Sequence, residues 1–366
     1  MAFYLILYIV ATLCAFCYAK AKTKIDILIF KTLLFLILFL PLALRYNIGT
    51  DYQNYIYFIK EYYFFKHNYF YFEPGWMPII YAIEKWNLSL QWFFVVPAFF
   101  STLIVLNEDV MERKYAYFCI PAYISIAYLR SFTAVRQLFA ATIFLLCIKH
   151  FEQKEYGKML FWLIIAFLFH KSAIILLPIL ILASFDWKKL NQYRALAIYA
   201  IMVAVFVIYN AAAFIMQNIA GNTFYANYIT NSTWNRAAEI NSGLGVLVKQ
   251  VLCVLILFSV RKEETDGTIN QITIRRYNLV CIATLCLAAF QILTTQIVIF
   301  NRLSDLFYPF YVYIATCLIK SKWKYRQLVC CMFIAILFLL FCKTLTISYI
   351  GGEGYNLIPY QSILIK

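Results

Sequence analysis

The sequence is poor in charged residues and in histidine. Of its 366 residues, 13% are charged, 64% are hydrophobic and three are histidine, whereas ordinary globular chains carry about 25% charged and about 45–50% apolar residues. A water-soluble fold cannot hide this much apolar side chain, because surface area grows too quickly with size. The composition therefore excludes an ordinary soluble domain and indicates a protein embedded in a membrane.

The sequence also lacks the motifs of several enzyme classes. Its histidines and carboxylates do not have metal-ligand spacing, and it contains neither a phosphate-cradling glycine loop nor a serine-nucleophile motif. The eleven cysteines lie inside apolar runs and resemble small buried hydrophobic residues. We therefore expect no disulfide framework, no metal and no cofactor.

Long apolar runs are abundant. Runs such as 27–44 are long enough to cross about 30 Å of hydrocarbon, and they lack the alternation of barrel strands. We predict an all-α fold, a polytopic bundle of about 12 transmembrane helices that forms a single integral membrane domain over residues 1–366. The predicted spans are 2–19, 27–44, 88–106, 115–130, 131–150, 158–170, 171–184, 195–217, 243–260, 277–299, 302–319 and 327–343.

Some apolar segments are shorter than a typical membrane span. The short spans 158–170 and 171–184 meet at His170 and Lys171, and this polar junction favours a tight hairpin over one long helix. Residues 74–85 are too short and too charged to span, so we expect a partly buried or interfacial helix there.

The positive charge of the chain is arranged in clusters. The sequence has 32 Lys and Arg against 17 Asp and Glu, and more than half of the basic residues lie in loops that twelve spans place on one face. These loops are 20–24, 113–114, 149–158, 188–194, 261–276 and 320–326. The positive-inside rule makes this face cytoplasmic, places both termini outside, and explains the charge without a nucleic-acid partner.

Five arginines are left on the outer face or in the outer half of the membrane. Because charge in hydrocarbon is costly, such residues usually line a cavity and pair with an anion. The alternative is a partner within the chain, such as Asp305, one helical turn after Arg302. Arg136 has no acidic residue within one turn, which favours a functional role. The five are Arg45, Arg130, Arg136, Arg236 and Arg302.

Two long segments, 45–75 and 218–242, face outward. Both are rich in Tyr, Asn and Trp, which suit the recognition of sugar rings, although interfacial aromatic belts produce the same bias. Asp51 lies in a turn after Gly49, where it is either a loop cap or a reactive carboxylate. Glu73 opens a helix and is either a cap or a site residue. His170 is either a packing residue or a neutral base.

Several short motifs together resemble the EpsG family of bacterial exopolysaccharide, capsule and O-antigen polymerases of the Wzy type. The resemblance extends from Arg45 to Leu364. Its motifs are Arg45 with Gly49-Thr50-Asp51, Glu73-Pro74-Gly75, Arg130 with Val135-Arg136-Gln137, His170-Lys171-Ser172-Ala173, Asn301-Arg302 and Pro359-Tyr360-Gln361-Ser362-Ile363-Leu364.

The resemblance implies glycosyl transfer at the periplasmic face of the bacterial inner membrane. The donor would be a glycan on undecaprenyl pyrophosphate and the acceptor a lipid-linked repeat unit, on a metal-independent scaffold similar to the GT-C glycosyltransferases. It also implies the bilayer as a partner, with a chain-length regulator or a flippase of the same pathway as further partners.

Residue types in the motifs fit this chemistry. A leaving pyrophosphate needs fixed positive charge, and arginine binds phosphate oxygens bidentately. The candidate pyrophosphate-binding residues are Arg136, Arg130, Arg302, Arg45 and Gln137. On a straight helix Arg130 and Arg136 would point about 120° apart, so they converge only if the chain turns between them. The candidate general bases are His170, Asp51 and Glu73, in that order.

Two other functions compete with polymerisation. A flippase or transporter of lipid-linked oligosaccharide would bind the same lipid, but it should show internal repeats and polar residues on both sides, which the sequence does not show. An O-antigen ligase or another polyprenyl-linked glycosyltransferase is the second alternative, although ligases usually have a larger outer domain than 218–242.

Overall fold

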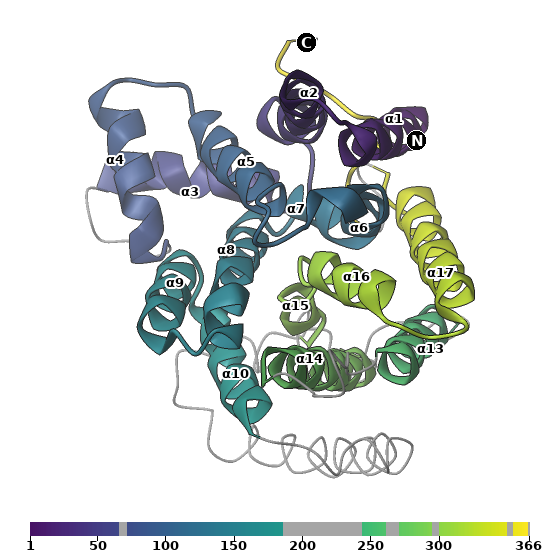
Figure 1. Ribbon diagram of the computed structural model, residues 1–366. Coiled ribbons are helices and arrows are strands. Elements are labelled where there is room, and N and C mark those ends of the chain that lie inside the picture. The colour runs from purple at the N-terminus through teal and green to yellow at the C-terminus, as the bar shows by residue number, and fades with distance from the viewer. Residues whose placement is uncertain (66–71, 186–243, 261–270, 295–299, 350–353, 365–366) are drawn as a thin grey trace. The chain divides into compact units, whose positions relative to one another are not determined.

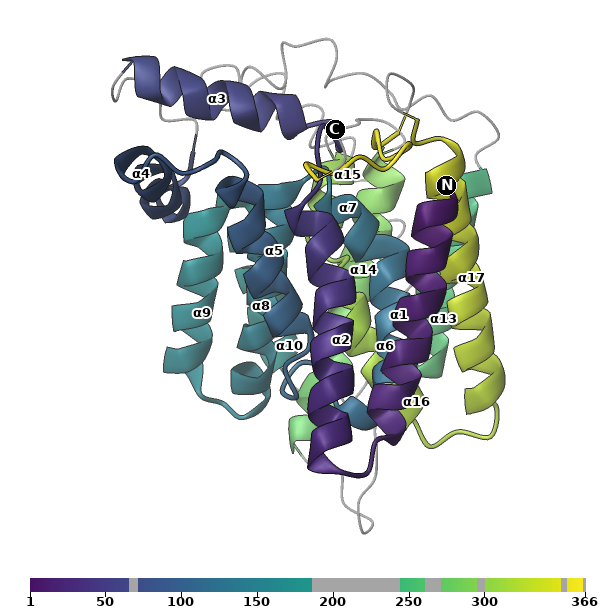
Figure 2. The same cartoon turned by 90° about the horizontal axis from the view of Figure 1, so that it is seen from above.

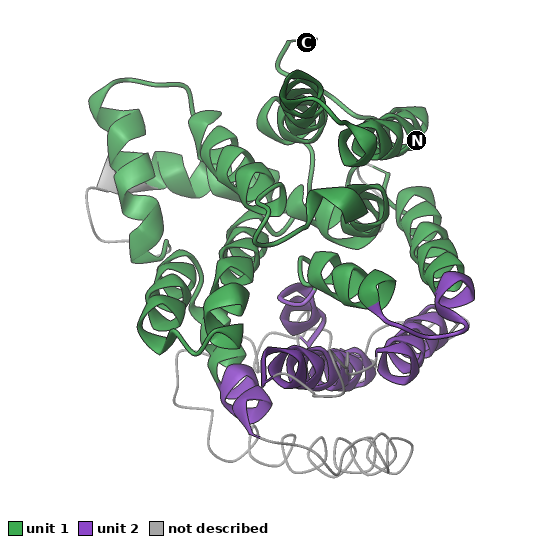
Figure 3. Cartoon of the chain, viewed as in Figure 1, with its two compact units in different colours: residues 1–177, 308–320, 330–366 green, residues 178–307, 321–329 purple. Residues whose placement is uncertain are grey.

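A computed structural model describes residues 1–65, 72–185, 244–260, 271–294, 300–349 and 354–364 (Figure 1). Helices dominate these residues, and no β-strand forms within them. The all-α prediction is therefore confirmed. The chain divides into two compact units, which are coloured separately in Figure 3.

The first unit comprises Met1–Leu177, Tyr308–Lys320 and Cys330–Lys366. Its helices and helical turns follow in chain order, and α2, α5 and α6 each continue through an internal proline. They are α1 (Ala2–Lys20), α2 (Lys24–Ala43), α3 (Tyr52–Phe65), the 3-10 turn η1 (Pro74–Trp76), α4 (Met77–Lys85), α5 (Trp92–Val105), η2 (Arg113–Tyr115), α6 (Ala116–Tyr123), a π-helical turn (Ile124–Tyr128), α7 (Leu129–Ser131), α8 (Val135–Glu152), α9 (Tyr156–Phe169), the 3-10 turn η4 (Lys171–Ile175), α16 (Tyr311–Lys320) and most of α17 (Arg326–Thr346).

The second unit comprises Pro178–Phe307 and Ser321–Val329. Within it, α13 (Leu244–Ser259) and α15 (Phe300–Asp305) both pack against α14 (Gln271–Thr294). Most of α10 (Leu176–Ser184) also belongs to this unit.

Four of the described helices are long and apolar enough to cross a membrane by length and composition. They are α1, α2, α14 and α17. Shorter apolar helices occupy several other predicted spans, so the count of twelve stays a prediction. Residues 195–217 and the outer segment 218–242, with Arg236, lie outside the described residues.

One predicted span is wrong as a continuous helix. Residues 302–319 were expected to form a single span, but α15 ends at Asp305 and α16 begins only at Tyr311. Pro309 lies in the interval, where it cannot donate a backbone hydrogen bond to a continuing helix.

The helix pair α8 and α9 positions the site described below. The helices lie side by side in both views (Figures 1 and 2) and are joined by a turn of three residues in which Lys154 has a positive φ of 62°. Such a short connection makes the helices antiparallel. The first turn of α8 and the last turn of α9 therefore lie at the same end of the pair.

The helix breaks at His170, as the polar junction predicted. His170 is extended, with φ −160° and ψ 120°, and η4 begins at the next residue. One long helix through 158–184 is therefore excluded.

The chain also turns between Arg130 and Arg136, because α7 ends at Ser131 and α8 begins at Val135.

Part of segment 45–75 forms α3, which runs across α2 and α5 instead of alongside them (Figure 2). Its entry depends on Gly49, which has φ +96° and lies against the backbone directly after α7: a Cβ there would be 1.9 Å from the carbonyl oxygen of Phe132. Only glycine fits this conformation and this approach.

The C-terminal tail covers the same region. The carbonyl of Asn356 accepts from Gly49 N at 3.1 Å, and that of Gln361 accepts from Tyr46 N at 3.0 Å. The Thr133 hydroxyl donates to the carbonyl of Tyr355 at 3.3 Å. Three segments that are far apart in sequence therefore meet, namely 45–49, 130–134 and 355–363.

Candidate active site

Glu73 is the centre of a buried polar cluster in the first unit. Its Oε2 lies 2.8 Å from Nη1 of Arg136, at the start of α8, and its Oε1 lies 2.8 Å from Nδ1 of His170, just after α9. The side chains of Glu73, Arg136 and His170 are 8%, 13% and 24% exposed. These three residues are called the Glu73 cluster below.

The turn that follows Glu73 is docked against the end of α9. Gly75 approaches so closely that a Cβ would lie 2.8 Å from the carbonyl oxygen of Leu168. Trp76 is fully buried, and its Nε1 donates to the carbonyl of Phe169 at 2.8 Å. Glu73 precedes the first residue of η1, but its side chain makes no capping hydrogen bond, so the cap hypothesis does not describe its carboxylate.

The electrostatics of the cluster favour the charged form of the Glu73 carboxyl. Burial alone would raise the pKa of the Glu73 carboxyl, but the hydrogen bond from His170 and the charge of Arg136 outweigh burial, and the pKa is lowered. A charged carboxylate only accepts hydrogen bonds, so Nδ1 of His170 carries a proton and donates. In a neutral imidazole the second nitrogen, Nε2, is then the one that can accept a proton.

The candidate arginines of the first unit each face aromatic rings. The guanidinium carbon of Arg136 lies 5.7 Å from the ring centre of Tyr55 and 5.4 Å from that of Phe72. That of Arg130 lies 4.4 Å from the ring of Tyr355. These stacks orient the planar guanidinium groups while using none of their N–H donors.

Arg45 is the most buried of these arginines, at 2% exposed. Its guanidinium lies 4.5 Å from the ring centre of Phe94, and its Nη1 donates to the carbonyl of Ser131 at 3.0 Å. Within the described part of the chain its Nε has no hydrogen-bond partner, and no carboxylate lies within ion-pair distance. It borders a small cavity of about 20 Å³, which has room for one water molecule.

The structure brings together only some of the predicted site residues. It joins Arg136, Glu73 and His170 directly. Gln137 is buried beside Arg136 on α8. Asp51 lies in the turn before α3, where its carboxylate accepts from the hydroxyl of Thr50 at 3.4 Å.

Arg302 lies on α15 in the second unit, on the same short helix as the buried Asp305. Arg136 has no acidic residue within one helical turn, but it has a partner within the protein, because Glu73 contacts it from 63 residues away in the sequence. The roles of Gly75, Trp76 and Tyr355 were missed: their contacts join segments that no sequence spacing relates.

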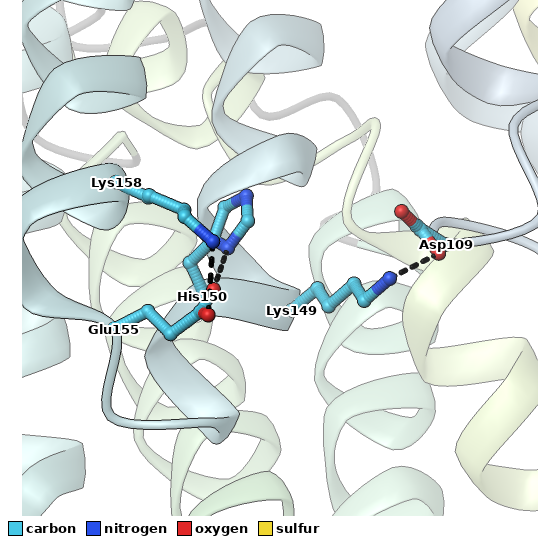
Figure 4. Close-up of polar contacts among 5 residues, drawn as sticks. All are labelled: Asp109, Lys149, His150, Glu155 and Lys158. Carbon is cyan, nitrogen blue, oxygen red and sulfur yellow. Dashed lines mark hydrogen bonds and ion pairs between the residues drawn. The ribbon is translucent and has the colours of Figure 1, made fainter.

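A second polar cluster lies at the other end of the α8–α9 pair (Figure 4). Glu155 contacts Nδ1 of His150 at 2.6 Å and Nζ of Lys158 at 2.9 Å. These three residues are called the Glu155 cluster below. Beside it, Lys149 pairs with Asp109 at 2.7 Å. Nowhere in the described ranges do three or more His, Cys, Asp or Glu residues form a group that could hold a metal ion.

Comparison with known protein families gives a match. The model of the EpsG family matches residues 28–362, which is nearly the whole chain. The Glu73 cluster, Arg45, Arg130 and most of the C-terminal tail lie inside the matched region. No curated protein and no solved structure gives a significant match.

Proposed function

The chain belongs to the EpsG family of Wzy-like polymerases, and from this we infer that it lengthens a lipid-linked polysaccharide by glycosyl transfer. Its membrane helices and its family agree on a membrane protein. The finer assignment is that repeat units are added to a glycan on undecaprenyl pyrophosphate, at the periplasmic face of a bacterial inner membrane.

The observation that carries this proposal is the Glu73 cluster. A glycosyl transferase that uses a hydroxyl acceptor needs a base within hydrogen-bond reach of that hydroxyl. A carboxylate on Nδ1 of His170 orients the imidazole and sets its tautomer, an arrangement that makes Nε2 the proton acceptor. We assign His170 as the base and Glu73 as the residue that orients it.

The reaction balances without an added reactant. The acceptor hydroxyl passes its proton to Nε2 of His170, and its oxygen forms a bond to the anomeric carbon of the donor sugar. The bond from that carbon to the pyrophosphate oxygen breaks, and the lipid pyrophosphate leaves with the electron pair. The growing glycan is thereby transferred to the lipid-linked acceptor.

Arginines supply the charge for the leaving group. Preorganised cations in a site poor in water stabilise charge that develops in the transition state. Arg45 has the strongest case, because it is buried and no described carboxylate balances its charge. Arg130, in the same unit as Arg45, comes next. The assignment of Arg302, on α15 in the second unit, stays a prediction from the sequence. Arg136 already contacts Glu73. We therefore propose that Arg136 and its neighbour Gln137 contribute less to pyrophosphate binding.

Asp51 is the weaker alternative as base. It lies in the entry turn of α3, where the hydroxyl of Thr50 donates to its carboxylate at 3.4 Å, whereas His170 has the carboxylate of Glu73 on Nδ1 to orient it. A variant in which Asp51 is replaced by Asn should keep most of the activity if His170 is the base.

The experiment uses the purified full chain in lipid nanodiscs. Its substrate is the lipid-linked repeat unit extracted from cells in which the gene for this protein is deleted, since such cells should accumulate single units. Longer lipid-linked glycans on a gel support the polymerase. Movement of the lipid across a vesicle without longer glycans would indicate a transporter instead, and transfer only after addition of a lipid A core would indicate a ligase.

A further inference from the structure

The Glu73 cluster is assembled from segments that the chain does not hold together locally. Glu73 is 97 residues from His170 in the sequence. His170 itself is extended, outside both α9 and η4. The direction of its imidazole therefore depends on where the last turn of α9 lies relative to the turn that carries Glu73.

Trp76 makes the contact that relates these two segments. The last carbonyls of a helix have no partner inside the helix, and the indole N–H of Trp76 satisfies the carbonyl of Phe169, the residue directly before His170. The indole also packs against Phe169, with ring centres 5.3 Å apart, and against Phe93 and Phe139 at 4.7 and 5.9 Å.

We propose that Trp76 is a positioning residue, which holds the end of α9 so that Nδ1 of His170 stays on the carboxylate of Glu73. This role rests on the proposed function of His170. The indole is fully buried, so it acts through the Glu73–His170 contact without touching the substrate. The close approach of Gly75 to Leu168 allows the turn to come near enough for the hydrogen bond.

The first test is kinetic. Trp76→Phe keeps an aromatic ring and removes the N–H donor. We expect kcat to fall by about tenfold or more, since small misplacements of a catalytic group are costly, while KM stays within about twofold because no substrate contact is lost. The matched control is Trp86→Phe, just after α4, where the side chain is exposed; it should leave both constants unchanged.

A double-mutant cycle separates positioning from general packing. If Trp76 acts through the Glu73–His170 contact, Trp76→Phe should cost much less in a Glu73→Gln background than in the wild type, because coupled residues are not additive. The same fold-loss in both backgrounds would overturn the proposal. Replacement of Trp76 by 3-benzothienylalanine, which keeps the shape of the indole and lacks the N–H, tests the hydrogen bond if Trp76→Phe folds poorly.

A second measurement does not depend on polymerase activity. Diethyl pyrocarbonate modifies accessible imidazoles, and mass spectrometry of peptides gives the rate for each histidine. In Trp76→Phe we expect modification of His170 to become severalfold faster, with His150 as the internal control at its wild-type rate. An unchanged rate at His170 would overturn the positioning role, whereas a wild-type chain that makes no longer glycans would overturn only the proposed function.

Discussion

Two glutamates at opposite ends of the α8–α9 pair are held by similar groups. Glu155 contacts Nδ1 of His150 and the ammonium of Lys158, while Glu73 contacts Nδ1 of His170 and the guanidinium of Arg136. α8 has 18 residues, so about 27 Å separates its two ends. The pKa of the carboxyl is lowered in both clusters. At Glu155 the hydrogen bonds from Lys158 and His150 lower it. At Glu73 burial would raise it, but His170 and Arg136 outweigh burial.

The clusters differ in burial and in how they are assembled. The side chain of Glu155 is 36% exposed and that of Lys158 is 65% exposed, against 8% for Glu73. Glu155 reaches partners five and three residues away, whereas the partners of Glu73 are 63 and 97 residues away. Water screens the first cluster, so it contributes little. The second is shielded from water and depends on the packing of three segments, as sites that perform chemistry often do.

The largest contrast should appear in activity. We expect His170→Ala to lower kcat by about 10²–10⁴-fold, the range typical of a lost general base. His150→Ala removes the equivalent histidine of the Glu155 cluster and should leave kcat unchanged. The measurement is the rate at which lipid-linked repeat units are extended by the purified variants. Equal losses in both variants would mean that the two histidines act through stability alone.

Removal of the carboxylate should lower the free energy of unfolding much more in the Glu73 cluster than in the Glu155 cluster. Glu73→Gln leaves the charge of Arg136 in a mostly buried place without its counter-ion, and breaking such a pair costs about 3–5 kcal/mol. Glu155→Gln should change the unfolding transition very little, since its partners are solvated. Thermal unfolding in a non-ionic detergent measures both. A small effect of Glu73→Gln would contradict the buried ion pair.

Substitution of a glycine near each cluster should give a smaller difference in stability. Gly75→Ala would place a Cβ 2.8 Å from the backbone oxygen of Leu168, and we expect the forced shift to cost about 1–3 kcal/mol and to lower activity. Gly157, in the first turn of α9, has no atom within 4 Å of such a Cβ. Gly157→Ala should therefore be neutral or stabilise the protein by up to about 1 kcal/mol, because alanine favours the helix. Destabilisation of similar size in both variants would contradict the docking of η1 on α9.

The sequence predicted features that depend on local composition. Spans 2–19 and 327–343 correspond to α1 and α17, since a long apolar run forms a helix wherever it lies. The break at His170 was also predictable, because a polar His-Lys pair interrupts two apolar runs. The break between Asp305 and Tyr311 was not predictable in this way, because Pro309 alone does not mark it: α2, α5 and α6 each continue through a proline.

The Glu73 cluster was predictable only in part. All three of its residues are candidates from the sequence: Arg136 and His170 because ionisable groups near hydrocarbon are costly, and Glu73 because it opens a helix within one of the short motifs. Their pairing was not predicted: Arg136 has no acidic neighbour on α8, and nothing in the spacing relates it to Glu73. The contacts of Trp76 and of the C-terminal tail could not be predicted from the sequence either, because they depend on which helix ends pack together.

Salt gives the finest test of the comparison. Raising ionic strength from about 0.1 to about 1 M shortens the Debye length from about 10 Å to about 3 Å, and this screens exposed charges far more than buried ones. The small destabilisation by Glu155→Gln at low salt should therefore disappear at high salt, since the wild-type cluster has then lost its attraction too. The loss caused by Glu73→Gln should persist at both concentrations. A Glu73→Gln effect that faded with salt in the same way would mean that water and ions reach the Glu73 carboxylate, and the assignment of a buried, preorganised base would then fail.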